Sequence, residues 1–244
     1  MQENLSEKTR GNLFPAQKKH VDYLINWAVK KSIIYVEVPK TGCTLIKRIL
    51  QYSEVNGDLS CLFDDVHDKV KSPLKSPHYD EREFLRAMSS EATCVFSFVR
   101  NPITRLLSAY LDKIVGTPGE ITSRQAKMGI EPGRSCPTFH EFVELVGNQT
   151  VSDMDVHWSP QTFLLGYKQV DYDYIGRFEF IDLCIEHLVS RFGLLIPPNA
   201  IQFGLDHATN AGARVADFYN PEILRKVRDI YHDDFLYLGY GRSI

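Results

Sequence analysis

A short loop at residues 39–44 carries the residue types that bind phosphate groups. Its sequence is Pro-Lys-Thr-Gly-Cys-Thr, and it connects a mainly apolar run at residues 33–38 to a helical pattern. Gly42 can adopt backbone angles that other residues avoid, so the loop amides can converge on an anion at the positive end of the following helix. Lys40 adds a full positive charge. The pattern predicts a strand, an anion-binding loop and a helix.

The residue order of this loop differs from that of the Walker motif. A Walker loop places its lysine after its second glycine, whereas Lys40 precedes the only glycine of this loop, Gly42. Kinase and ATPase functions are therefore disfavoured. The structural alternative is a turn that uses Gly and Thr only to bend and cap the chain.

A second motif begins where the apolar run at residues 95–99 meets Arg100. Asn101 is typical of a helix N-cap and Pro102 of the first helical position. Arg100 is expected at the carboxyl end of a strand, the edge where open α/β sheets bind ligands, and Ser108 two turns into the helix. Two anion sites predict a ligand with two separate phosphates.

Together the motifs resemble the membrane-bound type of carbohydrate sulfotransferases, the family that contains the HNK-1 and chondroitin 4-O enzymes. The similar stretches are PKTGCT, VRNPITRLLSAYLDK, DVHWSP and the closing pattern IYHDDFLYLGY, and they span most of residues 32–240. The resemblance implies the sulfotransferase fold, a P-loop-like three-layer α/β sandwich with a central parallel sheet. It also implies 3′-phosphoadenosine 5′-phosphosulfate (PAPS) as donor, adenosine 3′,5′-bisphosphate (PAP) as product, and no metal.

The resemblance also assigns roles to the two motifs. Arg100 and Ser108 would hold the 3′-phosphate, and Lys40 would stabilise the charge that develops on the bridging oxygen. Asn101 departs from the acidic residue that the family often has before this proline, and Lys47 is expected to be only a solvated charge. Six residues of the loop would hold the 5′-phosphosulfate: Pro39, Lys40, Thr41, Gly42, Cys43 and Thr44.

Transfer to a hydroxyl also needs a group that accepts the hydroxyl proton, and imidazole titrates near neutral pH. His67, in DDVHDKV, resembles the histidine that serves as base in related glycan sulfotransferases, so we place it first. His157 is the second candidate. It lies beside Trp158 in the HW pattern that shapes the acceptor cleft in this family, and the broad face of Trp158 suits stacking on a sugar ring.

Other charged residues leave two interpretations open. Glu179 matches an acidic position of the family or forms a structural ion pair, and Arg214 could reach the donor phosphate. Five further basic residues could line a cleft for an acidic saccharide or belong to a solvated charged loop, and the sequence fits both interpretations. They are Lys69, Lys71, Lys75, Arg124 and Arg134.

Composition limits the partners. Twenty-eight basic and 31 acidic residues give a net charge of −3, which argues against a nucleic-acid or anionic-membrane binder that relies on many phosphate contacts. The five cysteines are odd in number and widely spaced, which suits reduced thiols better than disulfides or a zinc site. Hydrophobic residues make up 43%, enough for a full core.

Hydrophobic spacing predicts the elements that position these motifs. Residues 1–31 are expected to form an arm and an amphipathic helix, the helix covering residues 16–30, and residues 32–244 a single PAPS-dependent domain. Long polar segments at 61–79, 116–137 and 205–219 are expected to be loops. Strands are predicted at 33–38, 93–99 and 173–178, with helices at 45–55, 80–89, 103–114, 138–146, 181–192 and from 221.

No apolar run approaches the length of about 18 residues that a membrane helix needs, and residues 1–14 are polar. The sequence as written therefore predicts a cytoplasmic protein without a membrane segment, or a Golgi-lumen domain if an anchor has been trimmed away. We expect sulfuryl transfer to a hydroxyl of a carbohydrate. Sulfation of a small non-carbohydrate metabolite, and a non-catalytic nucleotide- or glycan-binding module, are the alternatives. Neither acceptor identity nor oligomeric state follows from the sequence.

Overall fold

The computed structural model describes residues 21–116, 136–198, 200 and 209–241. By its internal contacts the chain divides into two compact units. Of the described residues, the first unit contains 21–99, 165–198 and 200, and the second contains 100–116, 136–164 and 209–241. Both units are therefore built from two separate stretches of sequence.

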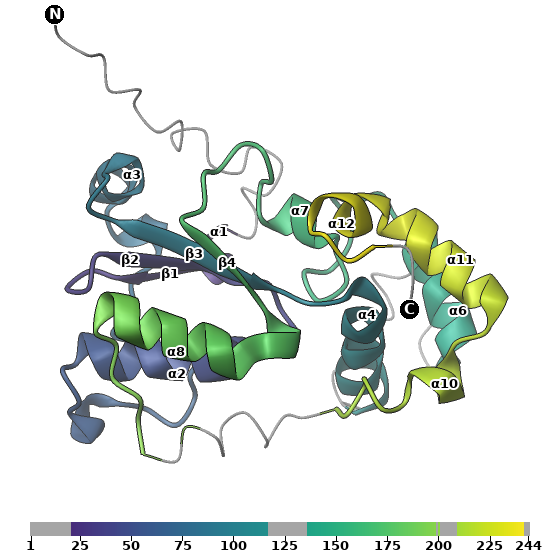
Figure 1. The fold of residues 1–244 in the computed structure, drawn as a ribbon, viewed down its shortest axis with the longest axis horizontal. Helices are drawn as coiled ribbons and strands as arrows, with labels where there is room; N and C mark the ends of the chain where they lie inside the picture. Colours follow the sequence, from purple (N-terminus) through teal and green to yellow (C-terminus); the bar gives the residue numbers. More distant parts are fainter. Residues whose placement is uncertain (1–20, 117–135, 199, 201–208, 242–244) are drawn as a thin grey trace, which may run out of the picture. The chain divides into compact units, whose positions relative to one another are not determined.

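The first unit is organised around a four-stranded sheet with the order β1-β2-β3-β4 (Figure 1). Its strands are Ile25–Ala28 (β1), Ile33–Val36 (β2), Cys94–Val99 (β3) and Tyr174–Arg177 (β4). The pairs β2–β3 and β3–β4 are parallel, whereas β1 pairs with β2 in the antiparallel direction. The predicted central parallel sheet is confirmed, with an antiparallel strand added at one edge.

Helices cover both faces of this sheet, which gives the first unit three layers (Figure 1). Helices α2 (Cys43–Glu54) and α8 (Ile181–Phe192) lie side by side on one face and share its apolar core. Helix α3 (Glu81–Ser89) covers the other face, where Phe84 packs edge-on against Trp27 of β1. The α/β class is therefore confirmed.

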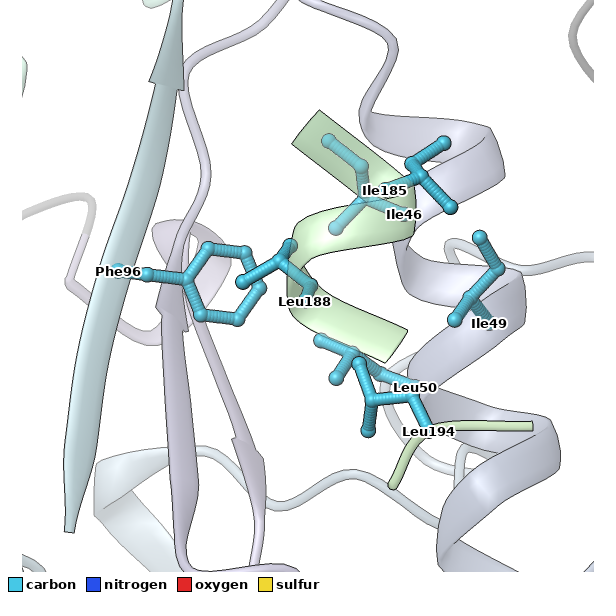
Figure 2. Close-up of a pocket in the computed structure, with 7 residues that line it drawn as sticks. All are labelled: Ile46, Ile49, Leu50, Phe96, Ile185, Leu188 and Leu194. Carbon is cyan, nitrogen blue, oxygen red and sulfur yellow. The ribbon is translucent and has the colours of Figure 1, made fainter. Parts of the chain in front are cut away.

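The core between α2, α8 and β3 contains a small gap (Figure 2). Its volume is about 10 Å³, about the room of one water-sized sphere. It is a packing defect and much too small for a nucleotide or a sugar. The side chains that line it are all apolar: Ile46, Ile49, Leu50, Phe96, Ile185, Leu188 and Leu194.

The helix predicted at residues 16–30 is wrong for its described second half. The structure has a one-turn helix at Val21–Leu24 (α1) followed directly by β1. All four residues of β1 are buried, including Asn26 and Trp27, which one apolar helix face would leave exposed. Pairing with β2 buries both faces of this segment, so tertiary pairing overrides the helical spacing. Residues 16–20 lie outside the described residues.

The remaining helical elements of the first unit are short turns that lie around the loop predicted at residues 61–79 and after β4. Two 3₁₀ turns flank this loop, Leu59–Cys61 (η1) and Pro77–Tyr79 (η2), and a third, Phe178–Phe180 (η4), leads from β4 into α8. Most of the predicted excursion at 116–137, and residues 205–208 of the next predicted loop, lie outside the described residues.

The second unit consists of helices around its own apolar core. The predicted N-cap at Asn101 is confirmed, because its side chain accepts a hydrogen bond from the first turn of α4. Thr138 and Asn220 cap α6 and α11 in the same way. Helix α4 continues into a π-helical turn, η3, so the prediction of a helix to residue 114 holds. The elements are α4 (Pro102–Tyr110), η3 (Leu111–Val115), α6 (Phe139–Gly147), α7 (Gln161–Leu164), α10 (Val215–Phe218), α11 (Pro221–Ile230) and α12 (His232–Tyr237).

In the described part of the chain, no helix combines the length and the apolar character that crossing a membrane requires.

Candidate active site

The loop between β2 and α2 has the backbone of an anion-binding turn. Lys40 and Gly42 both have positive φ angles, 72° and 84°, so the chain turns twice within three residues. Gly42 is the N-cap of α2, and no side chain caps the described start of this helix. The first-turn amides and the positive end of a 12-residue helix therefore remain available for an anion.

Side chains of the loop divide into structural and accessible groups. Thr41 is fully buried, and its hydroxyl donates to the carbonyl of Val38 (2.7 Å), which holds the turn closed. Burial, reinforced by the charge of Glu37, raises the pKa of the Cys43 thiol to about 12, so Cys43 is not a thiolate nucleophile. Lys40 and Thr44 are only half-buried. They are the loop side chains best placed to meet a ligand.

Beneath the loop lies a buried ion pair that the sequence did not reveal. Lys47 and Glu37 are 1% and 0% exposed, and the Lys47 Nζ lies 3.0 Å from the Glu37 Oε2. The expectation that Lys47 is a solvated charge is therefore wrong. The same Nζ lies 2.6 Å from Nδ1 of His67, and Nε2 of His67 lies 3.3 Å from the Thr44 hydroxyl. The structure thus connects His67 to the donor loop, as its sequence context led us to expect.

The loop that carries His67 is fastened to α2 by side chains of that helix. Arg48 donates to the carbonyl of Asp64 (2.8 Å), and Gln51 donates to the carbonyl of Val66 (3.2 Å). His67 itself is exposed, although Lys47 beside it on α2 is buried. A fixed backbone therefore presents an accessible imidazole beside the donor loop.

A second lysine completes the polar cluster. Lys69 donates to the Asn26 side chain and to the carbonyl of Ile25, both at 2.8 Å, and Asn26 donates to Glu37 (3.3 Å). Of the lysines proposed for a basic cleft, Lys69 is therefore used inside the fold. Lys71 and Lys75 are exposed, which fits the solvated-loop alternative. Arg124 and Arg134 lie outside the described residues.

In the second unit, Arg100 is held on both sides of its peptide. The Gln161 side chain accepts from the Arg100 amide (2.8 Å) and donates to its carbonyl (2.7 Å), while the guanidinium Nε donates to Thr104 (3.0 Å). Gln161 is in turn fixed by the buried Asp234, which accepts from the Gln161 amide (2.8 Å). Asp234 lies in the closing pattern of the sequence, which explains why that pattern accompanies the Arg100 motif.

Ser108 and Arg105 lie on α4. Ser108 is 2% exposed, and its hydroxyl accepts from Thr209 (2.9 Å). Arg105 is 1% exposed and donates to the carbonyls of Ser159 (2.8 Å) and Val156 (3.0 Å). Arg105 therefore links the second motif to the segment that contains His157, a connection that spacing alone could not show.

His157 is held by an acidic neighbour. Its Nδ1 lies 2.6 Å from the Asp155 carboxylate, and both side chains are partly buried, at 13% and 18% exposure. Trp158, in contrast, is 1% exposed, packs edge-on against Phe142 and donates through its indole to Gln149 (3.0 Å). The prediction that Trp158 stacks on a sugar is therefore corrected: its ring belongs to the core of the second unit.

Two further residues noted in the sequence have ordinary surroundings. The Arg214 guanidinium lies 5.1 Å from the centroid of the Phe218 ring, a cation–π contact within the second unit. Glu179 is exposed in η4. Among the described residues, no group of three or more His, Cys, Asp or Glu side chains is arranged to hold a metal ion.

Comparison with known proteins identifies relatives that match most of the chain. At 29% identity the chain is similar to human carbohydrate sulfotransferase 9, over 86% of this chain and 50% of the relative. It is 30% identical to human carbohydrate sulfotransferase 8, over 86% and 54%, and 25% identical to Xenopus laevis carbohydrate sulfotransferase 10, over 86% and 65%. The chain thus spans about half to two thirds of the length of these curated relatives.

No solved structure gives a significant match. Nothing in the comparisons supports the cytoplasmic location that the sequence led us to expect. The family model described as "Sulfotransferase family" matches residues 24–241, which include the donor loop, Arg100 and the closing pattern. The chain belongs to the sulfotransferase family.

Proposed function

We propose that the protein transfers a sulfuryl group from PAPS to a hydroxyl group of a carbohydrate acceptor. The observation that carries this proposal is the β2–loop–α2 turn, in which Gly42 opens the helix N-terminus and Lys40 supplies a cation, within a chain of the sulfotransferase family. The names of the relatives support a carbohydrate as acceptor.

The donor would bind through its two phosphate-containing ends. Residues 39–44 would hold the 5′-phosphosulfate, with loop amides and the Thr44 hydroxyl as donors and Lys40 facing the charge that develops on the bridging oxygen. Arg100 and Ser108 would hold the 3′-phosphate. The clamp of Gln161 on the Arg100 peptide supports this role, because it fixes the backbone from which the guanidinium extends.

A histidine would accept the proton of the acceptor hydroxyl as the new oxygen–sulfur bond forms. His67 and His157 are the two candidates, and the sequence places His67 first. Each ring has a neighbour at 2.6 Å from Nδ1, but the neighbours carry opposite charges: Lys47 for His67 and Asp155 for His157. Both residues would serve the reaction, as catalytic and acceptor-binding groups.

The direct test is turnover of PAPS that carries a radiolabelled sulfuryl group, with neutral and acidic oligosaccharides and small alcohols or phenols as acceptors. We expect a labelled oligosaccharide whose mass has increased by one sulfuryl group. Labelled phenols or alcohols alone would favour the small-metabolite alternative. PAP binding without turnover of any acceptor would favour a non-catalytic nucleotide-binding module.

A further inference from the structure

A continuous row of polar contacts leads from the buried Glu37 to the donor loop. It passes from Glu37 to Lys47 (3.0 Å), from Lys47 to His67 (2.6 Å) and from His67 to Thr44 (3.3 Å). We propose that this row is a directional hydrogen-bond chain in which His67 is a hydrogen-bond donor that orients the Thr44 hydroxyl toward the bound donor. His67 then is not the base of the reaction. The inference rests on the proposed function and refines it.

The direction of the chain follows from the chemistry of its members. A lysine ammonium has three hydrogen-bond donors and no acceptor, so Nδ1 of His67 must accept from Lys47. A neutral imidazole with an accepting Nδ1 carries its only proton on Nε2. Because Nε2 faces the Thr44 hydroxyl, His67 donates there. Thr44 is then left with its own proton to donate to an anion on the loop.

Burial fixes this direction. Lys47 is 1% exposed and Glu37 is 0% exposed, so water cannot readily replace either partner of the ion pair. The Glu37 carboxylate lies 3.0 Å from the Lys47 ammonium, which has donors only. Hydrogen bonds in such surroundings polarise one another, so a chain that starts at a buried ammonium strengthens the final donor. The positive end of the chain therefore points at the place where phosphosulfate would bind.

In the reaction, a bond forms between the acceptor oxygen and sulfur, and the bond between sulfur and the bridging phosphate oxygen breaks. The electron pair of the broken bond goes to the phosphate, where Thr44 and Lys40 donate. The acceptor proton cannot go to His67, whose Nε2 already carries a proton. We assign this proton to the second candidate base, His157, whose Nδ1 proton the Asp155 carboxylate accepts.

Substitutions of His67 that replace one ring nitrogen at a time distinguish a hydrogen-bond donor to Thr44 from a general base. The amide nitrogen of Gln can replace Nε2 as a donor to Thr44 but cannot act as a base. At saturating acceptor, we expect H67Q to turn over at least about 10²-fold faster than H67A, the usual worth of one preorganised donor. H67N, whose shorter amide corresponds to Nδ1, is the matched control and should resemble H67A. H157Q should lose about 10²–10⁴-fold, the usual worth of a general base.

The activity and the pH–rate profile of these variants decide whether His67 is the base or a hydrogen-bond donor. If H67Q is as inactive as H67A, and if the acid limb of the pH–rate profile disappears in H67Q, then His67 is the base and the proposal is wrong. If the limb persists in H67Q and disappears in H157Q, the proposal stands. Wild-type protein that transfers no sulfuryl group to any acceptor contradicts the proposed function, and the tautomer measurement then still decides the direction of the chain.

That measurement uses nitrogen NMR of protein labelled at histidine. We expect His67 to show a protonated Nε2 and an unprotonated Nδ1. K47M leaves the Glu37 carboxylate buried without its cation, so the double variant E37Q/K47M, which removes both charges, serves as the folded comparison. It should lose the fixed tautomer. A protonated Nδ1 in the wild type would overturn the proposed direction, whatever the activity.

Discussion

At the scale of single residues, Glu37 is the point where the charges of the first unit converge. Burial alone would raise its pKa, but the positive charges of Lys47 and Lys69 outweigh burial, and the pKa of Glu37 is lowered. For Lys69 the effect of burial is larger than the effect of the neighbouring charge. Burial lowers the pKa of Lys69 to about 8, although the charge of Glu37 acts in the opposite direction. The cluster therefore includes one cation that folding disfavours.

This imbalance predicts how stability depends on pH. Between about pH 8 and the ordinary lysine pKa of about 10.4, the unfolded chain binds more protons than the folded chain, so stability should rise with pH. Each unit of lowering corresponds to about 1.4 kcal/mol. Urea unfolding at several pH values should show this rise in the wild type and in the control K71M, whose lysine is exposed, but not in K69M. Equal slopes in wild type and K69M would contradict the prediction.

Arg100 supplies a second prediction at this scale. Because its guanidinium is assigned to the 3′-phosphate, R100A should weaken PAP binding by about 1.5–3 kcal/mol, the cost of a lost hydrogen bond to a charged group. Binding of adenosine 5′-phosphate should change little. Calorimetry with both nucleotides measures the difference, and T104V, which removes the hydroxyl beside Nε, should have a smaller effect. An equal loss for both nucleotides would show that Arg100 does not hold the 3′-phosphate.

At the scale of elements, the donor loop depends on a backbone conformation and on the space around it. Gly42 has a φ of 84°, and a Cβ at this position would lie 2.6 Å from Cδ1 of Ile181 in α8. A Cβ here would therefore displace the end of the Ile181 side chain. The positive φ is the main reason for a glycine at this position.

G42A should consequently damage both folding and donor binding. The left-handed conformation costs a residue with a Cβ about 1–2 kcal/mol, and the end of the Ile181 side chain must also move away. G193A is a matched control, because Gly193 also has a positive φ (59°) but has no atom within 4 Å of its Cβ position. Thermal unfolding should show a larger loss for G42A, and only G42A should weaken PAP binding. A similar loss of PAP affinity in both variants would argue against the loop as the binding site.

At the scale of the whole molecule, local patterns were predictable and long-range burial was not. The strand, loop and helix at residues 33–54, and the cap at Asn101, depend on neighbours in the sequence and were predicted correctly. Lys47 and Trp158 were misjudged because their surroundings come from distant segments. Lys47 is buried by Glu37 and the His67 loop, and Trp158 by α6. The strand β1 was missed because its apolar spacing also fits a helix.

A prediction at this scale concerns the charges that would neutralise the donor. The loop amides, Lys40 and Arg100 are all supplied by the protein, so PAP should bind without a divalent ion. Calorimetry in the presence of a chelator should give the same affinity as calorimetry with magnesium. A strict requirement for magnesium would point to a metal-dependent P-loop chemistry instead.

The segment that carries His67 also closes one side of the sheet. Trp27 of the edge strand β1 exchanges two backbone hydrogen bonds with Lys75, both 2.9 Å long, and the Ile25 carbonyl accepts from Lys69. An unprotected strand edge is a template on which a second chain can add a strand and begin to aggregate. The loop at 62–76 thus keeps the sheet from growing in the outward direction. Shortening this loop would therefore remove an imidazole from the candidate site and at the same time expose the protein to self-association.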